Sequence, residues 1–301
     1  NQSGVSALAT AVILPASSIR IPPGSGIKSG LSPFAFNQAR WNKYWRARQY
    51  FTNNNMVAAD LSQPNGGHEI PDPEYTTGTD ADGNPIAGLD ENGNPIPLFY
   101  EYVETGNSGN YTVRQLFGDK YRVVNPESDS ADNIVRATDG VLEANIYPLA
   151  SESGNFGTVD VGGLDNSTAV INRQITDGIS AEDMATYEDN RIDPSEESPV
   201  LLQGDTGVSG GIQSSLEEII GQCRGIVLYS SVSGHGNNAM FSIVEIVGVR
   251  IMDVQLSGSL GGGDKVLVIQ PCSWSDPAAE PDDDDVIDEE TTFFTPLILA
   301  Q

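Results

Sequence analysis

Histidine, cysteine and basic residues are scarce in this chain of 301 residues, which has two His, two Cys, and 15 Lys and Arg against 42 Asp and Glu. A structural zinc site needs about four Cys or His ligands at short spacings, and none occur here. The formal net charge of −27 repels a phosphate backbone. We therefore expect no zinc site and no nucleic-acid partner.

Long apolar runs are also missing, and residues 11–15 are typical of the longest. A transmembrane helix needs about 20 apolar residues, so we expect no membrane span in this chain. No secretory signal pattern is present. With 38% apolar residues, 32 Gly and 18 Pro, the composition indicates a soluble, loop-rich protein short of low-complexity disorder.

Charge is distributed unevenly along the sequence. Residues 1–50 contain no acid and six basic residues, whereas all 42 acidic residues and only nine basic ones lie in the other 251. Nine acids fall within residues 276–290. One interpretation is a basic patch that pairs within the same molecule. The other is contact between the basic end of one copy and the acidic end of the next, which would build a homo-oligomer or homopolymer.

The hydrophobic pattern predicts a mainly β protein with a few helices (α+β), with antiparallel sheets and long loops. Trp41, Tyr44 and Trp45 lie on one face of a helix expected over 37–51. Ser167 and Ser180 are suited to cap two further helices, and Ser214 and Glu217 fit a capping box. Strands are expected at 5–14, 18–21, 98–103, 111–117, 121–124, 140–148, 225–232, 239–248, 249–256, 265–270 and 291–300.

Four segments follow from this pattern. Residues 1–51 hold the N-terminal strand and the basic aromatic helix, and 52–137 form a loop-rich insertion. Residues 138–275 contain the α+β core, whose last part is an antiparallel sheet. An acidic linker and an apolar terminal strand occupy 276–301.

The insertion contains a repeat, DADGNPI at 80–86 and DENGNPI at 90–96. Gly, Asn and Pro at these spacings are typical of tight turns. The oxygen-bearing side chains also suggest calcium ligands, although the spacing departs from an EF-hand loop. The candidate ligands are Asp80, Asp82, Asn84, Asp90 and Asn92. No cofactor is required by the sequence, and calcium is the one that this repeat would hold.

The two cysteines lie at the outer ends of the predicted C-terminal sheet. Cys223 precedes its first strand and Cys272 follows its last. If these strands are neighbours, the thiols form a disulfide that closes a loop of about 50 residues and stabilises the fold by up to about 4 kcal/mol. Such a bond favours an oxidising, extracytoplasmic compartment.

Apolar residues at both termini predict an assembly interface. A terminal strand can complete the sheet of a neighbouring copy, or it can pair within its own domain. The residues that would form the interface are Val5, Leu8, Val12, Leu14, Phe293, Phe294, Leu297, Ile298 and Leu299.

Two short patterns invite a catalytic interpretation, and neither has the residues that its chemistry needs. The triplet at 205–207 matches the aspartic-protease signature, but a second copy is absent and the dyad needs two carboxylates. Ser233 and His235 lie too close together in a Gly-rich loop to form a typical nucleophile–base pair. We assign no catalytic residue and expect a protein that is not an enzyme.

Longer strings resemble the ectodomain of bacterial TadG-like putative Flp (tight-adherence) pilus-assembly proteins. The resemblance covers most of residues 18–42 and 138–272. It is carried by IPPG at 21–24, SPFAF at 32–36, GVLEANIYP at 140–148, GNFGTVDVG at 154–162, DNST at 165–168, LQGDTGVSGGI at 202–212, LEEIIG at 216–221, SGHGNNAMFSIV at 233–244 and VRIMDVQLSGS at 249–259.

This resemblance implies a non-enzymatic structural protein of the cell surface, extracytoplasmic, acting as a pilus or filament subunit or as a pilus-assembly component. Its partners would be further copies of the chain and other pilus or envelope proteins. Members of the family carry an N-terminal membrane anchor, whereas this sequence begins in the part that resembles the exported region. Two other functions stay open, namely a calcium-stabilised adhesion module and an envelope hydrolase that uses Asp205 or His235.

Overall fold

The computed structural model describes residues 10–61, 69–79, 85–87, 96–104, 111–115, 117–118, 141–145, 156–162, 167–205, 210–234, 238–256, 266–282 and 291–300. Its helices are α1 (Gln38–Asn53), α2 (Ala58–Leu61), α3 (Thr168–Asp177), α4 (Ala181–Met184) and α5 (Gln213–Glu217), with single 3₁₀ turns at Pro73–Tyr75, Glu188–Asn190 and Gly210–Ile212. Strands predominate and most pairs are antiparallel, which confirms the predicted mainly β, α+β class.

The strands are β1 (Thr10–Val12), β2 (Ala16–Arg20), β3 (Leu31–Asn37), β4 (Thr76–Thr79), β5 (Pro85–Ala87), β6 (Tyr100–Glu104), β7 (Tyr111–Gln115), β8 (Phe117–Gly118), β9 (Glu143–Asn145), β10 (Phe156–Val159), β11 (Arg191–Ile192), β12 (Val200–Asp205), β13 (Cys223–Ser233), β14 (Ala239–Gln255), β15 (Val266–Pro271), β16 (Trp274–Ser275), β17 (Ala279–Pro281), β18 (Phe293–Phe294) and β19 (Ile298–Ala300). Strands from both ends of the chain share sheets. β3, from the predicted segment 1–51, joins the large sheet that the 138–275 segment builds, and β17 pairs with β2.

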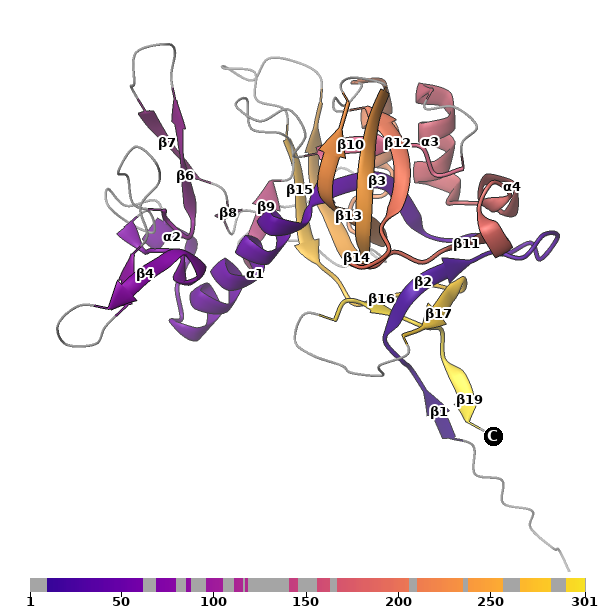
Figure 1. Ribbon diagram of the computed structural model, residues 1–301, viewed down its shortest axis with the longest axis horizontal. Coiled ribbons are helices and arrows are strands. Elements are labelled where there is room, and N and C mark those ends of the chain that lie inside the picture. Colours follow the sequence, from indigo (N-terminus) through magenta and orange to yellow (C-terminus); the bar gives the residue numbers. More distant parts are fainter. Residues whose placement is uncertain are drawn as a thin grey trace, which may run out of the picture.

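The main sheet has the order β12-β10-β3-β13-β14-β15-β9-β8, and β12 also pairs with β14. The second pairing closes β12, β10, β3, β13 and β14 into a ring, while β15, β9 and β8 extend from the far half of β14 (Figure 1). β14 serves both parts because its first half pairs with β12 and its second half with β15. We call these five strands the ring.

Two buried clusters lie on opposite faces of β3 and β13, as the alternation of side chains along a strand requires. Phe34 and Phe36 pack with the helical residues Trp41 and Tyr44 of α1. Ala35, between them, belongs to a second cluster with residues of β10, β12 and β14. Helices therefore cover one face of these strands, and the ring and the small sheets around β2 enclose the other (Figure 1).

Local signals placed several elements correctly. Helix α1 matches the predicted aromatic helix, and the Asn37 side chain accepts a hydrogen bond from the Arg40 backbone N–H at its start. The Ser167 side chain accepts one from Val170 N–H, and Ser180 forms a capping box with Asp183. These residues act locally, so a short window of sequence is sufficient to find them.

Several local predictions were wrong, and residues 291–300, for example, contain two short strands, β18 and β19, instead of one. Helix α5 begins after Ile212, and its start has no side-chain cap, so Ser214 lies inside the helix rather than before it. Ala239–Gln255 forms one long strand, β14, instead of two. The strand continues through Gly248 without a turn. A Cβ at this position would lie 2.3 Å from the Cys272 carbonyl oxygen, so glycine allows the segment that follows β15 to pass close to β14.

Candidate functional site

The two terminal segments of the described chain pair with each other. In β1 and β19, Thr10 is opposite Ala300 and Val12 is opposite Ile298, in antiparallel register. The pairing continues inward, because Leu14 N–H donates to Thr295 Oγ1 at 3.1 Å and Thr295 N–H donates to the Leu14 carbonyl at 2.9 Å. We call β1 and β19 the terminal ribbon. Pairing within one molecule was one of the two alternatives for these strands.

The ribbon projects from the body of the molecule (Figure 1). Among the described strands, β1 and β19 pair only with each other, so each leaves its outer edge without a strand neighbour. Ile13 is 46% exposed and Leu297 is 65% exposed at its base. An isolated two-stranded ribbon is marginally stable in water and accepts further strands readily.

The nine predicted interface residues have different environments. Val12 and Leu297 are exposed, while Leu14 and Phe294 are half-buried. Phe293 stacks on Trp274 with ring centroids 4.8 Å apart and is buried within its own chain. Ile298 and Leu299 lie in β19. Val5 and Leu8 lie outside the described residues.

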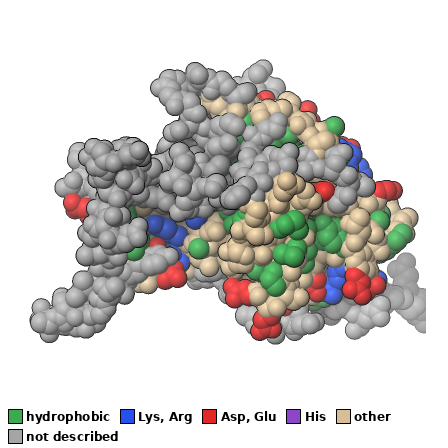
Figure 2. Space-filling model, turned by 45° about the horizontal axis from the view of Figure 1, so that its top comes forward, with side chains coloured by type: hydrophobic (Ala, Val, Ile, Leu, Met, Phe, Trp, Pro, Cys, Tyr) green, Lys and Arg blue, Asp and Glu red, His purple; other side chains and the backbone are tan. Residues whose placement is uncertain are grey.

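Basic side chains of the first 50 residues contact acids of the same molecule. Arg46 pairs with Asp72 at 2.9 Å and with Glu74. Arg20 lies 3.8 Å from Glu280, a member of the acidic stretch 276–290. Figure 2 accordingly shows blue and red side chains in separate small groups on the visible face, with no continuous basic surface. The intramolecular interpretation of the charge asymmetry holds for these pairs.

A groove of about 500 Å³ lies at the base of the ribbon. It is lined by four stretches distant in sequence, residues 15–17, 193–196, 244–246 and 291–293, together with Gln38 and Asp282. Four of the lining residues are carboxylates, and none is Lys, Arg or His: they are Asp193, Glu196, Glu245 and Asp282. We call this the acidic groove.

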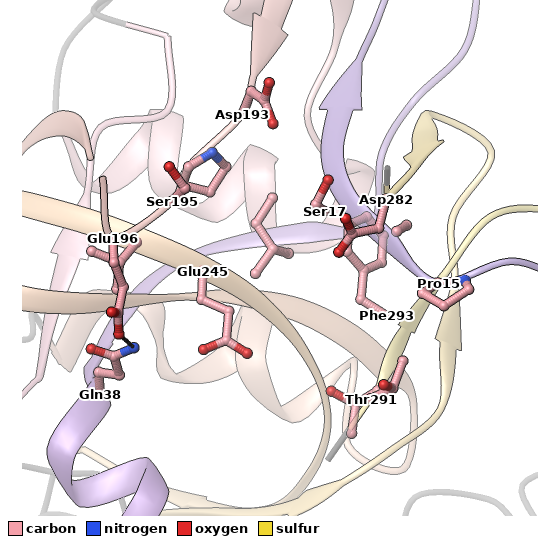
Figure 3. A pocket seen from close by; sticks show the side chains of 15 residues that line it. Pro15, Ser17, Gln38, Asp193, Ser195, Glu196, Glu245, Asp282, Thr291 and Phe293 are labelled. Atoms are coloured by element: carbon pink, nitrogen blue, oxygen red, sulfur yellow. Dashed lines mark hydrogen bonds between the residues drawn. The ribbon is translucent and has the colours of Figure 1, made fainter. Parts of the chain in front are cut away.

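The carboxylates reach the groove from different sides (Figure 3). Glu196 lies on one side, where it accepts a hydrogen bond of 3.0 Å from the Gln38 amide, and Asp282 lies on the other with Ser17. Glu245 stands between them on β14. Its neighbours Val244 and Ile246 are buried and Glu245 is exposed, at the point where the register between β13 and β14 shifts.

The floor of the groove coincides with a gap in the sheet. β12 pairs with β14 as far as Ile243, and the β15 pairing begins at Val249. Glu245 and Ile246 are paired with β13, Val244 lies at a shift in that register, and none of the three is paired with β12 or β15. The gap leaves the room that the groove occupies.

A buried carboxylate ties the segment after β2 to the C-terminal part of the chain. Asp276 accepts hydrogen bonds from Gly30 N–H at 2.7 Å, from Ser29 Oγ at 3.2 Å and from Ala278 N–H at 2.8 Å. Burial raises the pKa of Asp276, against these hydrogen bonds and the nearby Arg224 charge. These hydrogen bonds hold the C-terminal end of the loop at residues 22–28 in place.

The predicted disulfide is present. Cys223 and Cys272 are bonded, with Cα atoms 5.8 Å apart and a sequence separation of 49. They flank Arg250 of β14, whose Nη2 lies 3.7 Å from each sulfur. The bond therefore joins the start of β13 to the chain leaving β15, across β14.

The calcium and catalytic candidates fall largely beyond the described residues. β4, which precedes the first repeat, pairs with β5, which includes its last two residues. The candidate ligands Asp80, Asp82, Asn84, Asp90 and Asn92 lie outside the described residues, as does His235. Asp205 ends β12 opposite Thr158, and Ser233 ends β13 on the surface. In the described part of the chain, no group of three or more His, Cys, Asp or Glu is arranged to hold a metal ion.

Sequence reasoning did not find the acidic groove. Its one local signal is Glu245, a single charge within the apolar run FSIVEIVGV. An exposed charged residue on a strand is ordinary, so this signal alone does not identify a groove. The other three carboxylates come from segments that only the fold brings together.

In comparisons with protein-family models, curated proteins and solved structures, nothing matches this chain. The TadG-like resemblance is therefore neither supported nor opposed by a relative. Within the ranges that the structure describes, no helix is both long and apolar enough to cross a membrane.

Proposed function

We propose that this chain is a non-enzymatic, extracytoplasmic structural protein of the cell surface that associates with further copies through its terminal ribbon. The observation that carries the proposal is the ribbon itself, which has two outer edges without a strand neighbour in the described structure and projects from the body of the molecule. An extended segment that adds to such an edge gains main-chain hydrogen bonds without rearrangement of the core.

Three further observations agree with this proposal. The disulfide Cys223–Cys272 is the kind of bond that persists in oxidising compartments. The sequence strings similar to TadG-like pilus-assembly proteins suggest a pilus or filament subunit, or a pilus-assembly component. Arg20 of the basic N-terminal part pairs with Glu280 of the acidic stretch inside one molecule. We therefore expect the contact between copies at the ribbon edges and not between the oppositely charged ends.

The test removes β19 and leaves its anchor. A chain that ends at Pro296 keeps the Leu14–Thr295 hydrogen bonds and the buried Phe293, and lacks the strand opposite β1. Sedimentation over a range of concentrations should show large species for the full chain and monomers for the truncated chain. Electron microscopy of the same samples shows whether the large species are filaments.

The matched control is Leu201→Ser on β12. Leu201 is 61% exposed, close to the 65% of Leu297, and lies on the ring instead of the ribbon. This variant should associate like the full chain. Equal association of the truncated chain, or a full chain that stays monomeric at every concentration, would overturn the proposal.

A further inference from the structure

We propose that the Cys223–Cys272 bond is an exchangeable disulfide, which a small dithiol from outside opens and which closes again between the same two cysteines. The guanidinium of Arg250 stabilises the thiolate that leaves when the bond opens. This redox-sensitive site lies on the main sheet and does not involve the ribbon, so the two proposals stand or fall separately.

The guanidinium of Arg250 lies against both sulfur atoms. Its Nη2 is 3.7 Å from Cys223 Sγ and 3.7 Å from Cys272 Sγ, within reach of a weak hydrogen bond to each. A positive charge beside a cysteine favours the thiolate over the thiol. Because the two distances are equal, Arg250 stabilises the leaving thiolate whichever sulfur is attacked.

No acid of the described chain competes with the sulfurs for this charge. Arg250 takes part in none of the ion pairs among the residues that the structure describes. An arginine that pairs with a carboxylate has its charge largely balanced by that partner. The charge of Arg250 is therefore available to a thiolate that forms beside it.

The bond is also accessible from outside. Cys223 and Cys272 are each half-buried, and their neighbours Gln222 and Ser273 are exposed. Disulfide exchange requires a thiolate to reach one of the two sulfurs, so access decides whether a bond is inert or exchangeable. Partial exposure of both cysteines supplies that access without unfolding.

Other contacts hold the chain where it passes β14 beside the bond. Cys272 N–H donates to the Gly248 carbonyl at 3.0 Å, and Trp274 N–H donates to the Thr292 carbonyl at 2.8 Å. Trp274 is buried directly over Gly225, where a Cβ would lie 2.3 Å from its Cζ3 atom. The crossing segment therefore has anchors that do not involve the disulfide.

The second cysteine is held separately. Cys223 lies opposite Arg250 in the β13–β14 ladder, which continues without a shift as far as the pair Leu228 and Glu245. The two sulfurs thus stay near each other and near Arg250 when the bond is open. We expect the bond to close again between the same cysteines without refolding.

The exchange balances with a dithiol as the reductant. Its thiolate attacks one sulfur and forms a mixed disulfide, the Cys223–Cys272 bond breaks, and the electron pair leaves on the other sulfur beside Arg250. The second thiol of the reductant, as its thiolate, then displaces the first cysteine. The reductant becomes a cyclic disulfide, and its two electrons and two protons convert the protein disulfide into two thiols.

The test is the rate at which dithiothreitol reduces the folded protein, followed by alkylation of the freed thiols and mass spectrometry. Arg250→Gln removes the charge, so its bond should open about fivefold more slowly than that of the wild type. Arg250→Lys keeps a positive charge and should recover most of the wild-type rate. A melting measurement on each oxidised variant confirms that the fold is kept.

The matched control is Arg48→Gln. Arg48 is half-buried like Arg250, and its loss changes the net charge equally, but its guanidinium lies over the Trp45 ring on α1, 4.6 Å from the ring centroid. This variant should be reduced at the wild-type rate. A slowing equal to that of Arg250→Gln would assign the effect to overall charge and overturn the role of Arg250.

A second measurement uses the reduced protein and iodoacetamide. The pH midpoint of alkylation in the reduced wild type should lie below the ordinary cysteine value of about 8.5 and should rise by about one unit in Arg250→Gln. If Arg250→Gln does not fold, the wild-type midpoint alone decides, and a value at or above about 8.5 overturns the proposal.

Three further results would overturn the exchangeable bond. The first is a wild-type disulfide that dithiothreitol opens only after the protein is unfolded in urea. The second is reduction of Arg250→Gln at the wild-type rate. The third is loss of the native circular dichroism spectrum on reduction, or a failure of oxidised glutathione to restore the bond, either of which would make the disulfide a purely structural one.

Discussion

The β13–β14 pair and the terminal ribbon are both antiparallel ladders, and they differ in what supports them. Ten residue pairs join β13 to β14, and side chains from both faces are buried in the two clusters. Three pairs join β1 to β19, and the residues at the base of the ribbon are exposed. On folding, backbone groups exchange hydrogen bonds with water for hydrogen bonds within the protein, which contributes little net free energy. The burial of apolar side chains therefore decides the difference in stability between the two ladders.

This difference divides the molecule into a scaffold and an adaptable end. The strand register of the ring is fixed, because a slip of β3 by one residue would turn Phe34 and Phe36 away from α1. At the ribbon, the side chains of Val12, Ile13 and Leu297 are exposed, so these three do not fix its register by burial. The groove lies at the junction, lined by Pro15 and Thr291 from the ribbon side and by Glu245 from the ring.

Breaking the ring should have the largest effect on stability. Phe241 of β14 is fully buried and meets Tyr229 edge to face, with ring centroids 5.1 Å apart. Phe241→Ala removes this contact and leaves a cavity, so we expect a loss of about 3–5 kcal/mol in the free energy of unfolding. Urea denaturation measures it as a lower midpoint.

The control on the adjacent strand is Leu201→Ala. Leu201 lies on β12 opposite Ser242, which is the residue after Phe241 on β14, but the Leu201 side chain is 61% exposed. Its truncation should change the free energy of unfolding by no more than about 0.5 kcal/mol. A loss below about 1 kcal/mol for Phe241→Ala would show that the ring does not depend on its enclosed core.

The features that could be predicted from the sequence are those set by residues close together along the chain. Trp41, Tyr44 and Trp45 identified α1 because a helical face repeats within four residues, and Ser180 identified its helix through one turn of backbone. The disulfide was also predictable, because Cys223 and Cys272 flank strands that are neighbours both in sequence and in the sheet.

The remaining features depend on contacts between distant segments. Gly248 indicates a turn when only its neighbours are considered, and the true reason for glycine is the passage of Cys272 and Thr292 across the strand. The closure of the ring by β12 and β14 has no local signal. The groove combines residues as far apart as Ser17 and Thr292, so no window of sequence contains it.

A prediction of intermediate size concerns Asp183, in the helical region beside the ring. Burial alone would raise the pKa of Asp183, but hydrogen bonds from Arg173, Ser180 and Gln174 outweigh it and hold the pKa below its ordinary value of 3.8. Asp183→Asn weakens these bonds, so we expect a loss of about 1–3 kcal/mol in the free energy of unfolding at pH 7.

The sign of the pH dependence follows from the lowered pKa. The contribution of Asp183 is fully present above the ordinary carboxyl pKa and disappears as the pH falls through the lower pKa of the folded state. The gap between wild type and Asp183→Asn should therefore close in acid. Asp177→Asn, at a 54% exposed carboxylate, should show little effect at either pH. A gap that stays constant down to pH 2 would contradict the assignment to the ionised carboxylate.

The smallest effect on stability is expected at the ribbon, from Ile13→Ser. Ile13 is 46% exposed, so the polar side chain replaces an apolar one that water already reaches, and the free energy of unfolding should change by less than about 0.5 kcal/mol. Ile19→Ser is the matched change one strand further along, at a fully buried residue of β2, and it should cost several times more. Thermal melting compares the two variants directly. If Ile13→Ser destabilised the fold as much as Ile19→Ser, the ribbon would be an integral part of the core, and its edges would not be free to pair with a second copy.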